Sequence, residues 1–112
     1  MSAILVFTTL PDRASAEVLA SHLVAARLAA CVSIQAPCTS IYQWQGAVER
    51  SEETPLLIKT SNERYDALAA AIIERHPYAV PELIAVPISA GHPPYLDWIT
   101  SETRDDASPE ES

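Results

Sequence analysis

The sequence predicts an α+β sandwich in which the elements follow the order β-α-β-β-α-β, with a long central hairpin arm and a short C-terminal helix. Three observations predict it. Apolar runs short enough for strands alternate with two segments of helical spacing. The two middle strands follow one another around a glycine, without a helix between them. The length of 112 residues suits one domain, which we place at residues 1–103, followed by a disordered acidic tail at 104–112.

The first third of the chain predicts a strand followed by a helix. Residues 3–9 form a continuous run of β-branched and aromatic side chains, which is typical of a central strand buried on both faces. Asp12 follows a proline, and its carboxylate can accept the free N–H groups of a first helical turn. Apolar residues then recur at helical spacing as far as about Arg27.

The middle of the chain predicts a second strand and a projecting arm. Apolar residues alternate in a strand with one face that carries Ala30, Val32, Ile34 and Ala36. Cys31 therefore points to the other face. Gly46 marks a turn into a strand that returns through residues 49–60, and the polar tip of this hairpin cannot lie over the core. Because an isolated two-stranded arm leaves backbone groups unpaired, we expect another chain to complete it.

The last part of the chain predicts a helix, an edge strand and a short terminal helix. Residues 60–63 have the spacing of a capping box, and the helical pattern that follows ends at His76. The apolar run at 83–88 contains Pro87 and predicts an edge strand, and residues 95–99 are amphipathic. The whole order is the ferredoxin-like arrangement, and it leaves the sheet face with Cys31 open unless a partner covers it.

Composition excludes several classes of function. The net charge of −8 argues against nucleic-acid partners, and two glycines are too few for a phosphate-binding loop. No apolar run is long enough to cross a bilayer, so we expect no membrane partner. The first residues show no charged segment before an apolar one, and we expect a cytoplasmic location.

Five side chains are candidates for a site, and several also have a structural interpretation. The proline-rich corner after the second predicted helix carries His76, Tyr78 and Glu82. A histidine in this position also has a structural explanation, because the helix dipole stabilises a positive charge in the last helical turn. Cys31 is either a small packed residue or a metal ligand or reactive thiol. Lys59 lies at the end of an apolar strand, where lysines commonly extend toward solvent. We regard Cys38 as structural.

The chain resembles the CutA family of divalent-cation tolerance proteins over nearly its whole length. The resemblance rests on separate motifs in the right order: Thr9-Leu10-Pro11-Asp12, Leu28-Ala29-Ala30-Cys31-Val32, Ser40-Ile41-Tyr42-Gln43-Trp44-Gln45-Gly46, Leu57-Ile58-Lys59-Thr60, His76-Pro77-Tyr78-Ala79-Val80-Pro81-Glu82 and Tyr95-Leu96-Asp97-Trp98. Some relatives have a second histidine where this chain has Arg75, and some have a cysteine where it has Thr8 or its neighbour.

The resemblance implies a homotrimer that binds copper or another divalent cation and takes part in the response to heavy metals. It implies a cleft between subunits with a binding wall formed by Cys31, Lys59, Tyr78, Glu82 and Trp98. There we expect His76, with Cys31 or Glu82, to contribute to the metal site. We assign no catalytic residue and expect a binding protein rather than an enzyme.

Two alternatives remain open from the residues themselves. The first is a pocket between subunits for a small anionic ligand or substrate, with Lys59 as the charge, Tyr78 as a hydrogen-bond donor and Glu82 as a possible general base. The second is a trimeric scaffold or signalling adaptor that contacts partners through its arm or its acidic tail.

Overall fold

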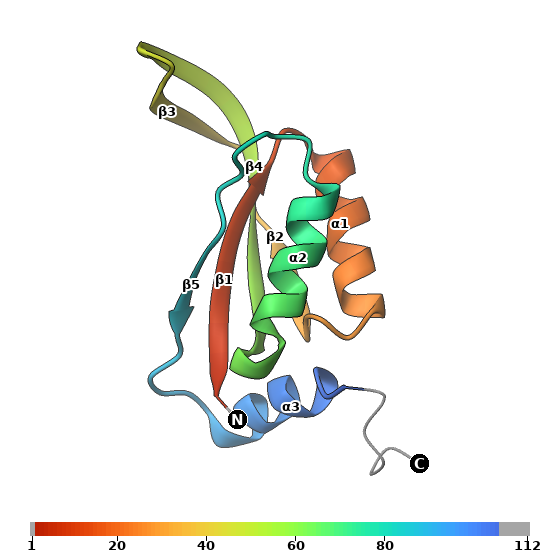
Figure 1. Ribbon diagram of the computed structural model, residues 1–112. Coiled ribbons are helices and arrows are strands. Elements are labelled where there is room, and N and C mark those ends of the chain that lie inside the picture. The colour runs from red at the N-terminus through yellow and green to blue at the C-terminus, as the bar shows by residue number, and fades with distance from the viewer. Residues whose placement is uncertain (1, 106–112) are drawn as a thin grey trace.

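The computed structural model describes residues 2–105 and follows the predicted order of elements (Figure 1). The acidic tail that we predict at 104–112 lies outside the described residues from position 106 onward. The strands and helices are β1 (Ala3–Leu10), α1 (Arg13–Ala25), β2 (Cys31–Ile34), β3 (Cys38–Trp44), β4 (Ala47–Ser61), the 3-10 helix η1 (Asn62–Arg64), α2 (Tyr65–Arg75), β5 (Ile84–Pro87) and α3 (Pro93–Glu102).

One antiparallel sheet organises the molecule. Its strand order is β2-β4-β1-β5, and β3 continues the line of β2 by pairing with the other half of β4. The predictions that the first strand is central and the last strand is at an edge are therefore confirmed. The expectation that the first strand is buried on both faces is wrong within one chain, because Leu5 and Phe7 on its second face stay partly exposed.

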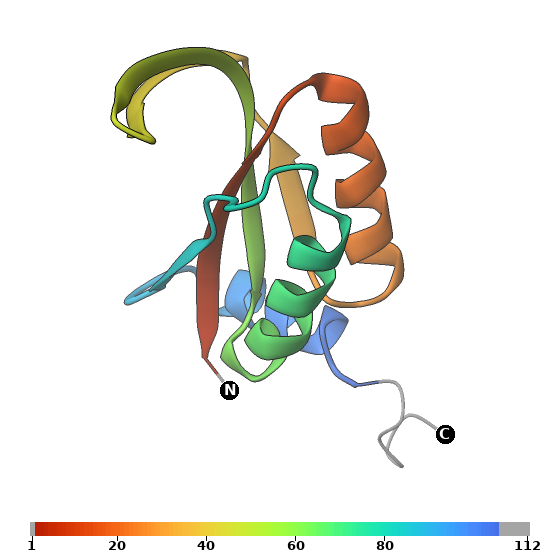
Figure 2. The same cartoon turned by 45° about the horizontal axis from the view of Figure 1, so that its top comes forward.

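The main core lies between the sheet and the two longer helices, which cover one of its faces (Figure 2). Alternate residues of the strands, such as Val6 and Ile58, are fully buried and directly opposite one another. Against them pack Leu23 of α1 and Ile72 of α2, both also fully buried. Val32 and Ile34 pack against this cluster, as the alternation in the sequence predicts.

The helix α3 closes the far end of the opposite sheet face. Its Ile99 is fully buried and forms a second small cluster with Ala3 and Ala30. The sequence pattern placed Ala30 on the face of Val32, which is wrong because Ala30 precedes the strand β2 and turns toward α3. The helix is also longer than the five residues predicted, since a proline at its first position favours a helix start.

The entrance to α2 differs from the sequence prediction. Ser61 makes no capping hydrogen bond, and Arg64 occupies the N-cap position of α2 after a short 3-10 turn. The hydroxyl of Ser61 instead lies 3.0 Å from the hydroxyl of Thr103, and Thr60 Oγ1 donates to the carbonyl oxygen of Leu28 at 2.7 Å. The hydroxyl groups that the capping-box pattern provides therefore bind residues distant in the sequence instead of the first turn of the helix.

The hairpin of β3 and the first half of β4 projects from the sheet and curves, which makes the molecule elongated at 52 × 28 × 23 Å (Figures 1 and 2). Trp44 and Ala47 are its last paired residues. The turn between them has positive φ at both Gln45 (50°) and Gly46 (83°), which is the geometry of a type I′ turn. The predicted arm and its glycine turn are confirmed.

Candidate functional site

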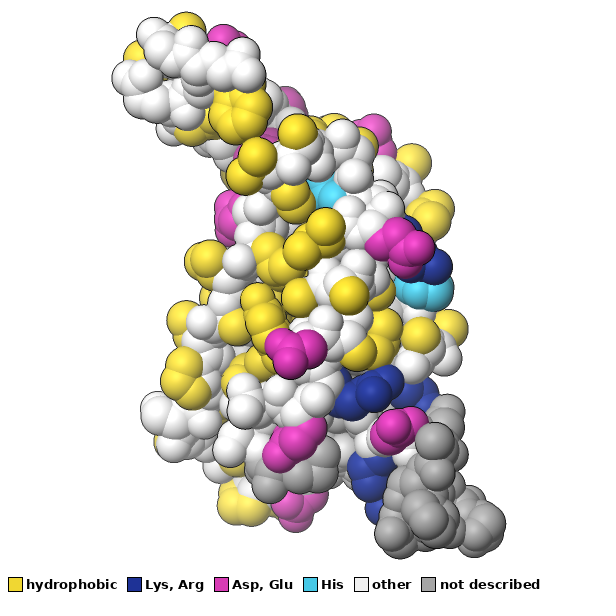
Figure 3. Space-filling model, viewed as in Figure 1, with side chains coloured by type: hydrophobic (Ala, Val, Ile, Leu, Met, Phe, Trp, Pro, Cys, Tyr) yellow, Lys and Arg dark blue, Asp and Glu magenta, His cyan; other side chains and the backbone are white. Residues whose placement is uncertain are grey.

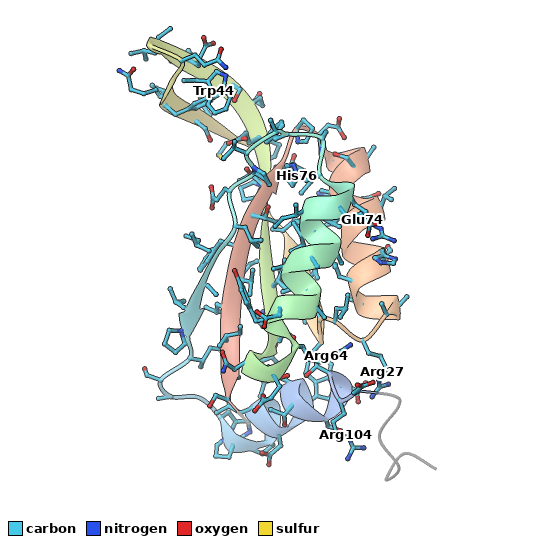
Figure 4. The ribbon with its side chains drawn as sticks, in the orientation of Figure 1. Arg27, Trp44, Arg64, Glu74, His76 and Arg104 are labelled. Atoms are coloured by element: carbon cyan, nitrogen blue, oxygen red, sulfur yellow. The ribbon has the colours of Figure 1, made fainter. Side chains whose placement is uncertain are left out.

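His76 lies at the base of the arm, where α2 ends, and it is 9% exposed (Figure 4). Its Nε2 is 2.7 Å from the carbonyl oxygen of Thr9, and its Nδ1 is 3.2 Å from the backbone nitrogen of Tyr78. A carbonyl oxygen only accepts, and a backbone N–H only donates. The imidazole is therefore neutral with its proton on Nε2, and both ring nitrogens have partners.

A cleft of about 430 Å³ opens beside this histidine, between the arm and the segment after α2. It is lined by Thr9, Ser40, Tyr42, Trp44, Glu53, Tyr78, Ala79, Val80 and Glu82. Two of the predicted site residues, Tyr78 and Glu82, thus lie in one cleft. His76 stands behind its wall, with its ring centroid 4.9 Å from that of Tyr78.

The electrostatic surroundings of the cleft are negative. Burial raises the pKa of Tyr78 to about 12, and the negative charge of Glu53 contributes to the shift. Glu53 is itself only 9% exposed, and its Oε2 accepts a hydrogen bond from Thr9 Oγ1 at 3.2 Å. No lysine or arginine is among the described residues that line the cleft.

The other predicted site residues lie elsewhere in the chain. Cys31 and Lys59 are direct partners in the pairing of β2 with β4, and both lie half-buried on the sheet face that α1 and α2 do not cover. Trp98 lies on α3 at the far end of the sheet and stacks on Tyr95, with ring centroids 5.6 Å apart. One chain therefore does not bring the whole predicted set together.

The predicted metal ligands are also separated within one chain. Cys31 is level with Leu5 of β1 across the sheet, whereas His76 contacts Thr9, four residues along that strand and about 13 Å away. Among residues 2–105 no group of three or more His, Cys, Asp or Glu side chains is placed to hold a metal ion. Both cysteines are free thiols. The part of one chain that the structure describes thus does not place His76 and Cys31 together.

Sequence reasoning assigned no site role to most of the residues that line the cleft, Thr9, Trp44 and Glu53 among them. Glu53 belongs to a polar stretch that we took for a solvated hairpin, yet it lies where the burial of β4 begins. Thr9 and Trp44 belong to motifs that the sequence singled out for the resemblance, without a role. The only available signal was the position of Glu53 beside an apolar run, where an alternating strand starts to bury every second residue.

Comparison with known proteins assigns the chain to a family. The family model described as "CutA1 divalent ion tolerance protein" matches residues 4–102. The chain belongs to the CutA1 family. A "Divalent-cation tolerance protein CutA" from Thermus thermophilus is 44% identical to it over 98 residues, which make up 88% of this chain and 95% of that protein. The resemblance that the motifs indicate is therefore confirmed.

Solved CutA structures share the fold. CutA1 from Oryza sativa superposes with a TM-score of 0.91 at 38% identity, covering 94% of this chain and 96% of that one. A protein from Archaeoglobus fulgidus, described as the periplasmic divalent cation tolerance protein CutA, superposes with a TM-score of 0.88 at 31% identity, covering 91% and 99%. Within residues 2–105, every helix is too short or too polar to traverse a lipid bilayer.

Proposed function

We propose that this CutA1 chain works as a homotrimer that binds divalent cations, copper among them, and so contributes to tolerance of heavy metals. Membership of the divalent-ion tolerance family supports the cation. The observation that carries the assembly is the sheet face opposite α1 and α2. It exposes a row of side chains that a single chain does not cover, comprising Leu5, Phe7, Cys31, Leu57, Lys59, Ile84 and Val86.

The exposed hydrophobic surface supports association. Ile84 and Val86 of the edge strand are 55% and 42% exposed, and Ile41 and Val48 of the arm are 63% and 68% exposed. Figure 3 shows hydrophobic side chains that reach the surface along β5 and again on the arm. Exposed apolar side chains that gather in this way are typical of an interface between proteins. The unpaired outer edge of β3 adds backbone groups that another strand can satisfy.

The assembly also bears on where a cation binds. Cys31 lies on the face that we expect a second chain to cover, and His76 lies at the arm base of its own chain. A site that contains both must therefore combine different chains. To offer Nδ1 to a metal, His76 must release the N–H of Tyr78. To offer Nε2, it must release Thr9 and move its proton to Nδ1, which also breaks the bond from Tyr78, so its use as a ligand costs one or two hydrogen bonds.

The assembly is tested by light scattering after size-exclusion chromatography. Wild type is expected at three times the mass of one chain. Ile84→Asp places a charge on the open sheet face and is expected to lower the mass, whereas Val18→Asp, on the solvent side of α1 at 72% exposure, is expected to leave it unchanged. A wild-type protein that runs as a monomer at all concentrations contradicts the proposal.

Cation binding is tested separately by calorimetric titration of copper into the assembled protein. Cys31→Ala and His76→Ala are each expected to weaken binding, because copper favours sulfur and imidazole ligands. Equal copper affinity in wild type and both variants would remove these two residues from the site while leaving the trimer intact.

We also propose that the protein acts in the cytoplasm. A relative from Archaeoglobus fulgidus is described as periplasmic, so the two locations are alternatives that an experiment can separate. Separation of the source cells into cytoplasmic and exported fractions, followed by immunodetection, tests it, and recovery from the exported fraction would overturn it.

A further inference from the structure

We propose that the cleft at the base of the arm binds a small organic cation of the ammonium class, held by the carboxylates of Glu53 and Glu82 and by the rings of Tyr42 and Trp44. This site is distinct from the divalent-cation role proposed above. It uses neither Cys31 nor the nitrogens of His76, and it lies within one chain.

The charge of the cleft favours a cation. Glu53 and Glu82 both line it, and within residues 2–105 no salt bridge to either carboxylate is found. Glu53 is 9% exposed, and its carboxylate has two neutral hydrogen-bond donors, Thr9 Oγ1 at 3.2 Å and the phenol of Tyr78. A largely buried carboxylate loses much of its hydration. A bound cation compensates the free-energy cost of that loss more fully than neutral hydroxyl donors do.

The behaviour of Tyr78 supports a negative potential in the same space. Burial raises the pKa of its phenol to about 12, and the negative charges of Glu53 and, more weakly, Asp12 act in the same direction. Each of these influences opposes a second negative charge in the cleft. The negative charges of Glu53 and Asp12 favour a positive one, whereas burial opposes a charge of either sign.

The aromatic side chains suit an organic cation. Tyr42 and Trp44 line the cleft and keep 42% of their surface exposed, so their rings are available to a ligand. The hydroxyl of Tyr42 lies 3.2 Å from Ser51 Oγ on the neighbouring strand, which fixes its end of the ring. Ammonium groups bind to the faces of such rings by cation–π attraction, and tryptophan is the strongest partner.

The size and donor set argue against the other classes of ligand. A volume of about 430 Å³ is far larger than a metal ion and lies in the range of small-molecule sites. The cleft has two carboxylates, and among residues 2–105 no group of three or more His, Cys, Asp or Glu side chains is placed to hold a metal ion. An anion finds no lysine or arginine on the described walls of this cleft within one chain.

The experiment uses choline as the probe and follows the two tryptophan indole N–H signals by NMR, in the presence of a chelator that removes divalent metals. Trp44 lies in the cleft and Trp98 lies on α3, so the second signal is an internal control. Choline is expected to shift the Trp44 signal in a saturable manner and to leave Trp98 in place. The neutral isostere, in which a tert-butyl group replaces the trimethylammonium, is expected to bind at least several times more weakly.

Variants identify the groups that hold the cation. The side chain of Glu82 is exposed, so we expect Glu82→Gln to keep the fold. We expect this variant to weaken choline binding by roughly two- to fivefold, which is the contribution of one exposed ion pair. Trp44→Leu is expected to weaken it by a similar factor, as read from the fluorescence or chemical shift of a second cleft reporter such as Tyr78. Glu63→Gln, an exposed acid on η1, is the matched control and is expected to bind choline as wild type does.

Three results would overturn the inference: no shift of Trp44 with choline, equal binding of the neutral isostere, or unchanged binding in both Glu82→Gln and Glu53→Gln. Because all metals are chelated, these outcomes leave the copper titration and the oligomer mass untouched. Conversely, a protein that binds choline but no copper would separate the two proposals.

Discussion

The imidazole Nε2 of His76 donates a hydrogen bond of 2.7 Å to the carbonyl oxygen of Thr9, a residue 67 positions earlier in the chain. The same ring accepts the backbone N–H of Tyr78 through Nδ1. One neutral side chain thereby fastens the end of β1 to the corner after α2. It also holds Tyr78 in the wall of the cleft, although it does not line that cleft itself.

Removing the His76 ring and its two hydrogen bonds is expected to destabilise the fold. His76→Ala removes two hydrogen bonds and a buried ring, and we expect it to lower the free energy of unfolding by about 2–4 kcal/mol. Guanidinium unfolding at one fixed protein concentration measures the change. His22→Ala, on a half-buried part of α1, is the control and is expected to cost less. Equal unfolding midpoints for the two variants would show that the hydrogen bonds of His76 do not stabilise the corner.

Tyr78 is expected to titrate last among the four tyrosines. Its folded-state pKa of about 12 exceeds the ordinary value of 10.0, so its contribution to stability is fully present below pH 10 and is lost as pH rises through 12. Tyrosinate absorbance measured against pH should show one late step. Tyr78→Phe should abolish that step and flatten the loss of stability in the same window, and a late step that survives the substitution would assign it to another tyrosine.

The turn of the arm is expected to respond in opposite directions to two substitutions. Gly46 has φ of 83° and no atom within 4 Å of an added Cβ, so Gly46→Ala tests backbone strain alone. We expect a cost of about 1–2 kcal/mol. Gln45→Asn is expected to stabilise, because asparagine tolerates the positive φ of 50° better than glutamine does. Amide exchange of the arm in both variants measures the effect, and a change of the same sign in both would contradict this account of the turn.

The C-terminal boundary of the domain is expected to fall at Thr103. Its side chain is fully buried, and its Oγ1 lies 2.8 Å from the carbonyl oxygen of Ile99 and 3.0 Å from Ser61 Oγ. A chain ending at Thr103 is the reference for this test, because it keeps both contacts of the Thr103 hydroxyl. A chain ending at Glu102 should lose about 1–2 kcal/mol relative to this reference, as measured by denaturant unfolding. Equal stability of the two chains would show that these contacts do not stabilise the domain.

The sequence predicted the order of elements, because hydrophobic period and turn residues are local signals. Asp12 shows this well: it caps α1 as expected, and its Oδ1 accepts the N–H of Ser15 at 2.8 Å. Ser61 shows the limit of such reasoning. It lies in the capping-box spacing of Thr60 and Glu63, but Thr60 and Ser61 bind Leu28 and Thr103 instead, which are 32 and 42 residues away, and no local rule contains those contacts.

The candidate site was predictable only in part for the same reason. Tyr78 and Glu82 are close in sequence and share the cleft, so the proline-rich corner located one wall. Glu53 and Trp44 form the other wall because the arm curves back over the corner, and curvature leaves no mark in the alternation of residues. The chemistry of Glu53 depends on its burial, which a charged residue in a polar stretch does not reveal.

The pairing of β1 has a consequence for synthesis of the chain. Its partners in the sheet are β4 and β5, so residues 3–10 find their first hydrogen-bonded neighbour only at residues 54–61. When only the first fifty residues have left the ribosome, the apolar segment 3–10 therefore has no partner strand with which to form its hydrogen bonds. We expect the sheet to assemble late in translation, when the arm has already closed on itself, and the nascent N-terminal half to depend on shielding until then.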